Sequence, residues 1–116
     1  MPKAKLISVI IPAYKQESTI IKDLTRIQKV LNQIRYPYEI IVVVDGQLDK
    51  TYQRTKPLTS PQLKVYLNKT RQGKGYSVRY GMTKAKGDYI AFIDAGMEID
   101  PNGISMLLEH LEWYNA

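Results

Sequence analysis

The sequence predicts an α/β protein in which helices cover both faces of a mostly parallel sheet, giving three layers, α/β/α. The main observation is an alternation along the chain: apolar, β-branched runs are followed by segments whose apolar residues recur every three or four positions. These patterns are typical of buried strands and amphipathic helices. The second observation is that the connections are short, and strands that alternate with helices in this way form parallel sheets.

The strand predictions rest on four apolar segments. The first is halted by Pro12, and the second and fourth lead directly to Asp45 and Asp94. The first two are rich in β-branched apolar residues, which is typical of strands buried on both faces. The third alternates apolar and polar residues, so we expect it to be more exposed. The expected strands are residues 6–11, 39–44, 63–67 and 89–93.

The helix predictions rest on apolar periodicity and on end signals. Residues 18–33 carry the clearest helical pattern, and a short helical turn is expected from Asp49. A third helix follows the Gly-Lys-Gly of residues 73–75, and we expect Gly87 to close it at the C′ position. Pro101 stands where a first-turn proline would, so a last helix is expected to begin there.

The composition limits the classes of function. A chain of 116 residues, 44% hydrophobic and 24% charged, is expected to form one folded domain. It has no cysteine, which excludes disulfides, zinc–thiolate sites and a thiol nucleophile. His110 is the single histidine, so a metal site built from histidines is not expected.

The formal net charge of +6 favours anionic partners such as phosphorylated ligands, acidic lipid surfaces or nucleic acid. The positive residues are scattered rather than gathered in a run, so a solvated basic surface is the alternative. The nine tyrosines are compatible with base stacking, but most fall on expected strands and helices and are expected to pack. Tyr14 is the exception because it follows the first strand. We therefore expect no nucleic-acid partner.

Asp45 and Asp94 each follow an apolar strand directly. Ligands of parallel α/β sheets bind beyond the carboxyl ends of the strands, so both carboxylates are expected at the binding edge. There a carboxylate can accept from a base or a ribose hydroxyl, or hold a divalent cation. The alternative is turn formation or helix capping, for which aspartate is also favoured.

Residues 94–100 place three carboxylates within seven residues. Mg²⁺ and Mn²⁺ take oxygen ligands, and Mg²⁺ usually combines one or two carboxylates with substrate phosphates. Asp100 directly precedes Pro101 and is expected to cap the last helix instead. Glu98 has no such structural task and is therefore a candidate metal ligand.

The segment from Arg71 to Gly75 is a basic, glycine-containing loop before a helix. Backbone N–H groups at the helix N-terminus, supported by Arg71 and Lys74, could cradle a phosphate, although Gly-Lys-Gly is also a common turn. The loop lacks the spacing of a Walker motif, and no Gly-x-Gly-x-x-Gly follows the first strand. A dinucleotide-binding domain is thereby disfavoured.

Four segments also carry a family resemblance. Residues 7–17 read ISVIIPAYKQE, residues 43–51 read VVDGQLDKT, residues 73–82 read GKGYSVRYGM, and residues 94–101 read DAGMEIDP. In order and spacing they resemble the VSVIIPAYNEE, VDDGSxDxT, GKGxAVxxGM and DxD motifs of family 2 glycosyltransferases with the GT-A fold. The third motif resembles the form found in the branch of the family that makes polyprenyl- or dolichyl-phosphate sugars.

The resemblance implies a Rossmann-like fold, the nucleotide-binding half of a GT-A domain. It also implies transfer of a sugar, with inversion, from a UDP- or GDP-sugar to an acceptor, with a divalent cation (Mg²⁺ or Mn²⁺) on the leaving diphosphate. The resemblance implies that Asp45 forms a hydrogen bond with the base and that Lys74 lies near the base or the diphosphate. Asp94 is expected to contact the ribose or the metal ion. The implied nucleotide-binding residues are Pro12, Ala13, Tyr14, Glu17, Asp45, Lys74 and Asp94.

Two positions depart from the family pattern. Val44 replaces the first aspartate of the family's Asp-Asp pair, and Gly96 replaces the second aspartate of the DxD motif. Some relatives read DADLQ, where the glutamine also approaches the metal, and Glu98 stands at that position. We therefore expect Asp94 and Glu98 to share the cation.

Residues 1–116 are expected to be a single nucleotide-sugar-binding domain, truncated because the family continues with strands that carry the acceptor site and the catalytic carboxylate. No catalytic base is assigned. No apolar stretch approaches the roughly 20 residues that span a bilayer, and no secretory signal is recognised. We expect a cytoplasmic protein that meets a lipid-phosphate acceptor at the cytoplasmic face of a membrane. The alternative function is a non-catalytic nucleotide-binding module or an inactive fragment.

Overall fold

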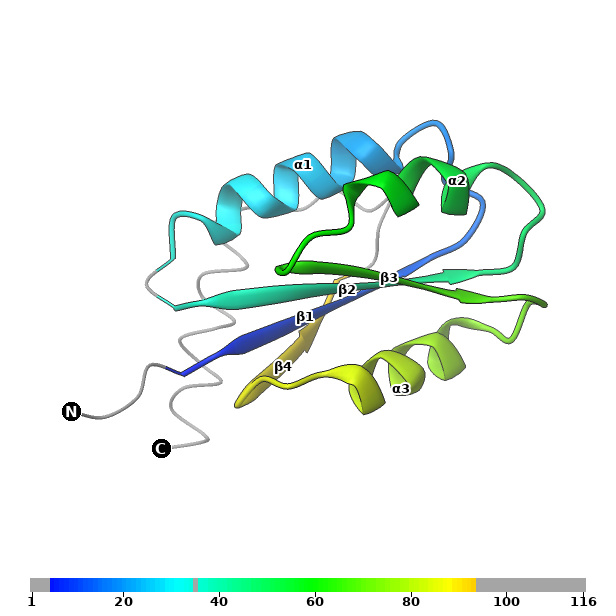
Figure 1. Cartoon of the computed structure of the whole chain (residues 1–116). Coiled ribbons are helices and arrows are strands. Elements are labelled where there is room, and N and C mark those ends of the chain that lie inside the picture. The colour runs from blue at the N-terminus through cyan, green and yellow to red at the C-terminus, as the bar shows by residue number, and fades with distance from the viewer. Residues whose placement is uncertain (1–4, 35, 94–116) are drawn as a thin grey trace.

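The computed structural model describes residues 5–34 and 36–93. Within them the predicted α/β fold is confirmed: a four-stranded sheet in which all strand pairs are parallel, with the order β3-β2-β1-β4 (Figure 1). The strands follow the predicted segments closely. They are β1 (Ile7–Ala13), β2 (Tyr38–Asp45), β3 (Leu63–Asn68) and β4 (Tyr89–Phe92).

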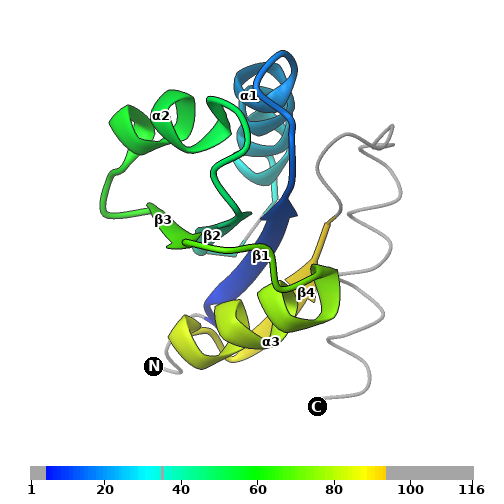
Figure 2. The same cartoon turned by 90° about the vertical axis from the view of Figure 1, so that its right-hand side faces the viewer.

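Helices lie on both faces of this sheet, as the three-layer prediction requires. Helices α1 and α2 cover one face and α3 covers the other (Figures 1 and 2). The helical segments are α1 (Ile20–Leu31), α2 (Thr51–Thr55), the 3₁₀ turn η1 (Lys56–Leu58) and α3 (Lys74–Lys84). The helix expected from Pro101 lies outside the described residues. No helix of the described part is both long and apolar enough to cross a bilayer.

The larger core lies between α1 and the sheet. The apolar residues of α1 that recur every three or four positions are fully buried there, which confirms the predicted helix face. Alternate residues of β1 and β2 meet them, because successive side chains of a strand point to opposite faces. The members from these three elements include Ile20, Leu24, Ile27, Leu31, Ile7, Val9, Ile11, Ile40, Val42 and Val44.

Pro12 does not halt β1, contrary to the sequence prediction; the strand continues to Ala13. The carbonyl of Ile10 accepts a hydrogen bond from the Ile93 N–H, so Ile10 turns its polar groups toward β4. Residues two apart in a strand share this direction, so the nitrogen of Pro12 also faces the β4 side. Strand pairing with β4 ends at Phe92 opposite Ile10. Within the described residues, the missing N–H of Pro12 therefore interrupts no strand pairing.

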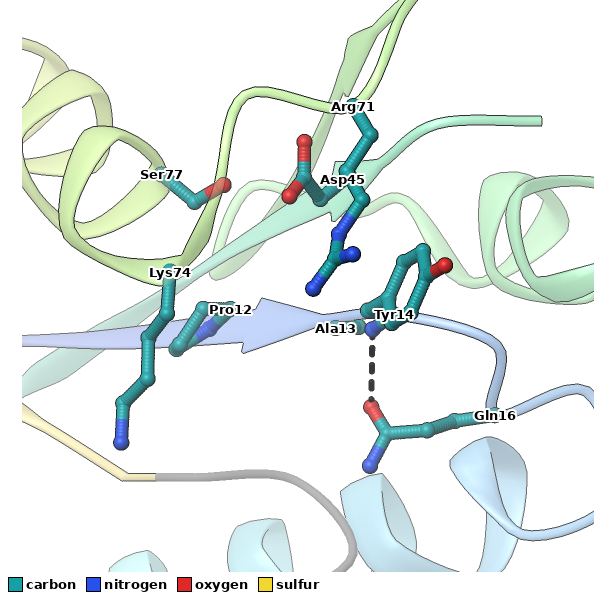
Figure 3. Close-up of a pocket in the computed structure, with 8 residues that line it drawn as sticks. All are labelled: Pro12, Ala13, Tyr14, Gln16, Asp45, Arg71, Lys74 and Ser77. Carbon is teal, nitrogen blue, oxygen red and sulfur yellow. Dashed lines mark hydrogen bonds between the residues drawn. The ribbon is translucent and has the colours of Figure 1, made fainter. Parts of the chain in front are cut away.

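Helix α3 lies close to the sheet because Gly81 faces it. Beneath the helix, Ile10, Ile41 and Val43 form a second, smaller core. A Cβ atom added at Gly81 would lie 2.6 Å from Cγ2 of Ile10, so only glycine permits this approach. The first turn of α3, with Lys74, is thereby held beside the carboxyl ends of β1 and β2 (Figure 3).

The sequence predicted that Gly87 closes α3 at the C′ position, and this prediction is wrong. The helix ends at Lys84, its C-cap Ala85 is extended, and Gly87 lacks the positive φ of a C′ glycine. Gly87 instead packs against β1, where an added Cβ would lie 2.7 Å from the nitrogen of Ser8 and 2.9 Å from the carbonyl oxygen of Leu6. A close backbone approach, rather than helix capping, requires the glycine.

Candidate functional site

A pocket of about 230 Å³ lies at the carboxyl ends of β1 and β2, beside the first turn of α3 (Figure 3). This is the edge of the sheet at which the sequence analysis expected a ligand. The pocket is lined by Pro12, Ala13, Tyr14, Gln16, Asp45, Arg71, Lys74 and Ser77.

Most of the nucleotide-binding residues expected from the sequence are brought together here. Five of the seven line the pocket: Pro12, Ala13, Tyr14, Asp45 and Lys74. Glu17 lies on the same loop but is not among the lining residues, and its N–H donates to Oδ2 of Asp49 (3.3 Å). Asp94 and Glu98, the expected metal ligands, lie outside the described residues.

Asp45 ends β2 and is only 4% exposed, yet it carries a carboxylate. Three donors of its own chain satisfy that carboxylate. Oδ1 accepts hydrogen bonds from the N–H of Gln72 (2.7 Å) and the side-chain amide of Asn68 (3.2 Å). Oδ2 accepts from the N–H of Gly73 (2.8 Å). Asp45 therefore anchors the loop that connects β3 to α3.

This anchoring corrects part of the phosphate-cradle interpretation. The N–H groups of Gln72 and Gly73 already hold an anion, the Asp45 carboxylate, and so are not available to a ligand phosphate. Gly73 takes a positive φ of 100°, which a residue with a side chain rarely adopts. The loop thus offers a ligand its side chains, Arg71 and Lys74, rather than these two backbone groups.

The positive side chains at the pocket are arranged around an aromatic ring. The Arg71 guanidinium lies over the ring of Tyr14, 4.2 Å from its centroid, and Figure 3 shows the two side by side. The Lys15 ammonium lies 5.5 Å from the same ring. Lys74 reaches across the other side of the pocket, with Nζ 5.8 Å from the ring centroid of Phe92. Because Asp45 is hydrogen-bonded to its own chain, these cations give the pocket a surface suited to an anion.

Hydrogen bonds from α2 hold the loop that follows β1. Gln16 accepts from the Tyr14 N–H through Oε1 (3.2 Å), and its own N–H donates to the buried Thr51 hydroxyl oxygen (2.8 Å) (Figure 3). Asp49 in turn accepts from the Thr51 hydroxyl (2.6 Å) and N–H (3.0 Å). The VDGQLDKT segment therefore positions the Tyr14 loop as well as supplying Asp45.

The same bonds favour the charged form of Asp49. Burial opposes the charge, but hydrogen bonds from Thr51 and from the Glu17 N–H outweigh it, and the Lys15 ammonium adds to them. Together they lower the pKa of the Asp49 carboxyl below its usual value. Asp49 is therefore ionised at neutral pH and acts as an acceptor in the loop network.

The sequence analysis did not single out Gln16 and Ser77, which also line the pocket. Ser77 is fully buried, and its hydroxyl accepts from the Asn68 amide and donates to the Gly73 carbonyl (both 3.1 Å). A serine on the inner face of a helix near its start was the available signal. Gln16 gave no signal, because only the fold brings it to Thr51.

The residues that the structure describes do not supply a metal site. Among them, no group of three or more histidine, aspartate or glutamate side chains could hold a metal ion. Asp45, the carboxylate in the pocket, already accepts three hydrogen bonds from N–H groups and does not fit as a metal ligand. The expectation that Asp94 and Glu98 hold the cation stays a prediction.

A parallel α/β sheet with a basic pocket at its carboxyl edge is the arrangement in which α/β domains bind their ligands. Residues 8–116 match the model of glycosyl transferase family 2, and the chain belongs to this family. This confirms the resemblance found in the four sequence motifs.

Curated relatives include sugar transferases of polyprenyl phosphates. The chain is 30% identical over 110 residues to an undecaprenyl-phosphate 4-deoxy-4-formamido-L-arabinose transferase of Pseudomonas fluorescens, covering 91% of this chain and 32% of the relative. It is 31% identical over 107 residues to a dolichol-phosphate mannosyltransferase of Pyrococcus furiosus, covering 91% of this chain and 30% of that one. The chain thus spans about a third of the length of these relatives.

Solved structures confirm the fold as the corresponding part of larger GT-A enzymes. The mannosyltransferase PcManGT from Pyrobaculum calidifontis, in complex with GDP-Man and Mn²⁺, superposes with a TM-score of 0.73 at 22% identity, over 92% of this chain and 32% of that one. Glucosyl-3-phosphoglycerate synthase from Mycobacterium tuberculosis, in complex with Mn²⁺, UDP and glucosyl-3-phosphoglycerate, gives 0.70 at 25% identity, over 92% and 39%.

Proposed function

We propose that this chain is the donor-binding segment of an inverting glycosyltransferase and holds the nucleoside diphosphate of a UDP- or GDP-sugar in the pocket at the ends of β1 and β2. The observation that carries the proposal is the combination of Arg71 and Lys74 with the Tyr14 ring around one pocket of about 230 Å³. The cations can form charged hydrogen bonds with the diphosphate, and the aromatic ring can pack against the base or the ribose.

Each lining residue has a task in this proposal. Pro12, Ala13 and the Tyr14 ring form the apolar wall against the nucleoside. Lys74 and Arg71 contact the diphosphate, whose negative charge grows as the sugar leaves. Asp45 accepts three hydrogen bonds, whereas a carboxylate can accept about four, so it retains capacity for one donor of the base.

The acceptor in this proposal is a lipid phosphate at the cytoplasmic face of a membrane. Two curated relatives are named as transferases of undecaprenyl phosphate and dolichol phosphate. Because the chain spans about a third of such relatives, the acceptor site and the general base are assigned to parts beyond these 116 residues. The chain on its own is therefore proposed to bind its donor without transferring the sugar.

The Lys74→Ala variant is expected to bind UDP or GDP at least about tenfold more weakly than the parent chain. A hydrogen bond to a charged group contributes about 1.5–3 kcal/mol, and 1.4 kcal/mol is a factor of ten. Isothermal titration calorimetry with UDP, GDP and the corresponding UDP- and GDP-sugars measures the effect. Lys22→Ala, which removes an exposed lysine of α1, is the matched control and should leave affinity unchanged. Equal affinity of Lys74→Ala and the parent would contradict the proposed site.

The Glu98→Ala variant is expected to lose the Mn²⁺ enhancement of sugar-nucleotide binding. The motivating observation is the spacing Asp-Ala-Gly-Met-Glu, in which Glu98 stands four residues after Asp94 and Gly96 supplies no carboxylate. The same titration, with and without Mn²⁺ or Mg²⁺, measures the loss, and Glu109→Ala serves as a control for removing one negative charge. Mn²⁺ enhancement unchanged by Glu98→Ala would disprove the shared-cation assignment. Binding of the parent that is indifferent to metal would instead support the non-catalytic nucleotide-binding module.

A further inference from the structure

Charge is segregated along this chain by structural element. From Lys50 to Gly87 it carries ten of its 17 lysines and arginines and none of its 11 aspartates and glutamates. This stretch forms α2, η1, β3 and α3. Strand β3 lies at one end of the described sheet, and α3 covers the face opposite to α1 (Figure 2). Three of these ten cations, Lys50, Arg54 and Lys56, lie at α2 and η1 on the α1 side of the sheet. The other seven, from Lys64 to Lys86, belong to β3, α3 and the segments that adjoin them.

Tyrosines and cations alternate on the surface formed by β3 and α3. The rings of Tyr66 and Tyr80 meet edge to face with centroids 5.8 Å apart, and Tyr76 stacks on Tyr80 at 6.4 Å. Nζ of Lys84 lies 5.6 Å from the Tyr66 ring centroid and 5.5 Å from that of Tyr80. We call this surface the basic face and define it by Lys64, Tyr66, Tyr76, Arg79, Tyr80 and Lys84.

Exposed apolar side chains lie on the same side of the sheet as the basic face. Met82 of α3 is 48% exposed and Phe92 of β4 is 53% exposed. Phe92 pairs with Ile10, and the Ile10 side chain packs against Gly81 of α3. The side chain of Phe92 therefore also points to the α3 side of the sheet. The Lys74 ammonium near the Phe92 ring agrees with this placement.

We propose that the basic face docks on an anionic lipid bilayer, with Met82 and Phe92 exposed on the same side of the sheet. Lysine and arginine are attracted to acidic headgroups, and tyrosine favours the interface because its ring is apolar and its hydroxyl polar. Met82 and Phe92 would bury apolar surface among the acyl chains of the bilayer. Among the described residues, Glu39 and Asp88 accept backbone N–H groups from Lys86 and Leu6, and the carboxylate of Asp45 is buried beside the start of α3.

Vesicle binding tests this docking without any sugar nucleotide, so its failure is distinguishable from failure of the proposed donor site. The full chain is mixed with vesicles of phosphatidylcholine, either alone or with roughly 40 mol% phosphatidylglycerol to give a strong negative surface potential. The vesicles are then sedimented, and the bound protein is measured. Binding is expected only to the anionic vesicles and should weaken as salt rises. The double variant Arg79→Gln/Lys84→Gln is expected to bind about thirtyfold more weakly, since each cation near such a surface contributes about fivefold.

The matched control is Lys22→Gln/Lys29→Gln, which removes two exposed lysines of α1 on the opposite face. It changes the net charge equally and should retain most of the binding. Equal losses in the two variants would overturn the proposal, because net charge alone would then explain binding. Tight binding to a single-stranded oligonucleotide with no binding to anionic vesicles would also overturn it. Unchanged circular dichroism spectra and melting temperatures show that both variants fold.

Discussion

Replacing Gly87 by alanine is expected to lower the free energy of unfolding by about 3 kcal/mol. The added Cβ would lie 2.7 Å from the nitrogen of Ser8, closer still to its hydroxyl, and 2.9 Å from the Leu6 carbonyl. Two of these three atoms, the Ser8 nitrogen and the Leu6 carbonyl oxygen, belong to the backbone, so no change of rotamer relieves the overlap. The connection from α3 to β4 must move away from the sheet.

That movement breaks a set of hydrogen bonds at the amino end of the sheet. The Gly87 N–H donates to the Ser8 hydroxyl (2.8 Å), and the Lys86 N–H donates to Oε2 of Glu39 (2.6 Å). The Ser8 hydroxyl donates to the same Glu39 oxygen (2.5 Å). These hydrogen bonds join β1, β2 and the connection from α3 to β4, so we expect these three segments to loosen together.

Urea denaturation followed by circular dichroism measures the Gly87→Ala effect as a lower midpoint at an unchanged slope. Gly75→Ala is the matched control, because an alanine there meets only the flexible end of Arg79 at 3.3 Å. Gly75 lies within α3, where alanine is preferred by up to about 1 kcal/mol. A Gly87→Ala chain as stable as the parent would show that the connection does not need this close approach.

Replacing Asp45 by alanine is expected to have the second large effect, on stability and on nucleotide affinity. The variant leaves the N–H groups of Gln72 and Gly73 without their acceptor, and the Asn68 amide keeps only its bond to the Ser77 hydroxyl. A buried polar group left unpaired costs about 1–3 kcal/mol, and water can reach part of this loop, so we expect a loss of about 3 kcal/mol in total. The loop that carries Arg71 is then no longer fixed beside Tyr14.

The affinity of the Asp45→Ala chain for UDP or GDP is therefore expected to fall by more than about tenfold. Urea denaturation and calorimetry on the same sample give both quantities. Asp88→Ala is the comparison, because Asp88 is an exposed carboxylate that accepts one backbone N–H, from Leu6 (2.9 Å), far from the pocket. A stable Asp45→Ala chain with parental nucleotide affinity would refute the anchoring role.

The sheet and its binding edge could be predicted from the sequence because both follow from local pattern. The β-branched apolar residues of β1 and β2 can be recognised in the sequence without tertiary information, and so can the periodicity of α1. Strand ends in a parallel sheet share one edge, so Asp45 and the Tyr14 loop were placed correctly in space. Lys74 followed from the third motif.

The predictions that were wrong depend on which backbone groups face which neighbour. Pro12 was expected to halt β1, but β1 continues to Ala13, and the described pairing with β4 already ends opposite Ile10. Gly87 was assigned to a helix end, although the approach of β1 is what excludes a side chain. Of the phosphate-cradle interpretation, only the backbone part is corrected: Asp45, 27 residues from Gln72 in the sequence, occupies the N–H groups of Gln72 and Gly73, while Arg71 and Lys74 line the pocket. No local pattern encodes such contacts between distant segments.

The anchored loop also affects how fast a ligand can bind. Because Asp45 fixes the loop from β3 to α3, this loop is not expected to rearrange when the proposed nucleotide binds. The rate of association is then set by diffusion and by the attraction of Arg71 and Lys74 for an anion, and it should slow as salt is added. Differences in affinity among nucleotides should accordingly arise in their dissociation rates.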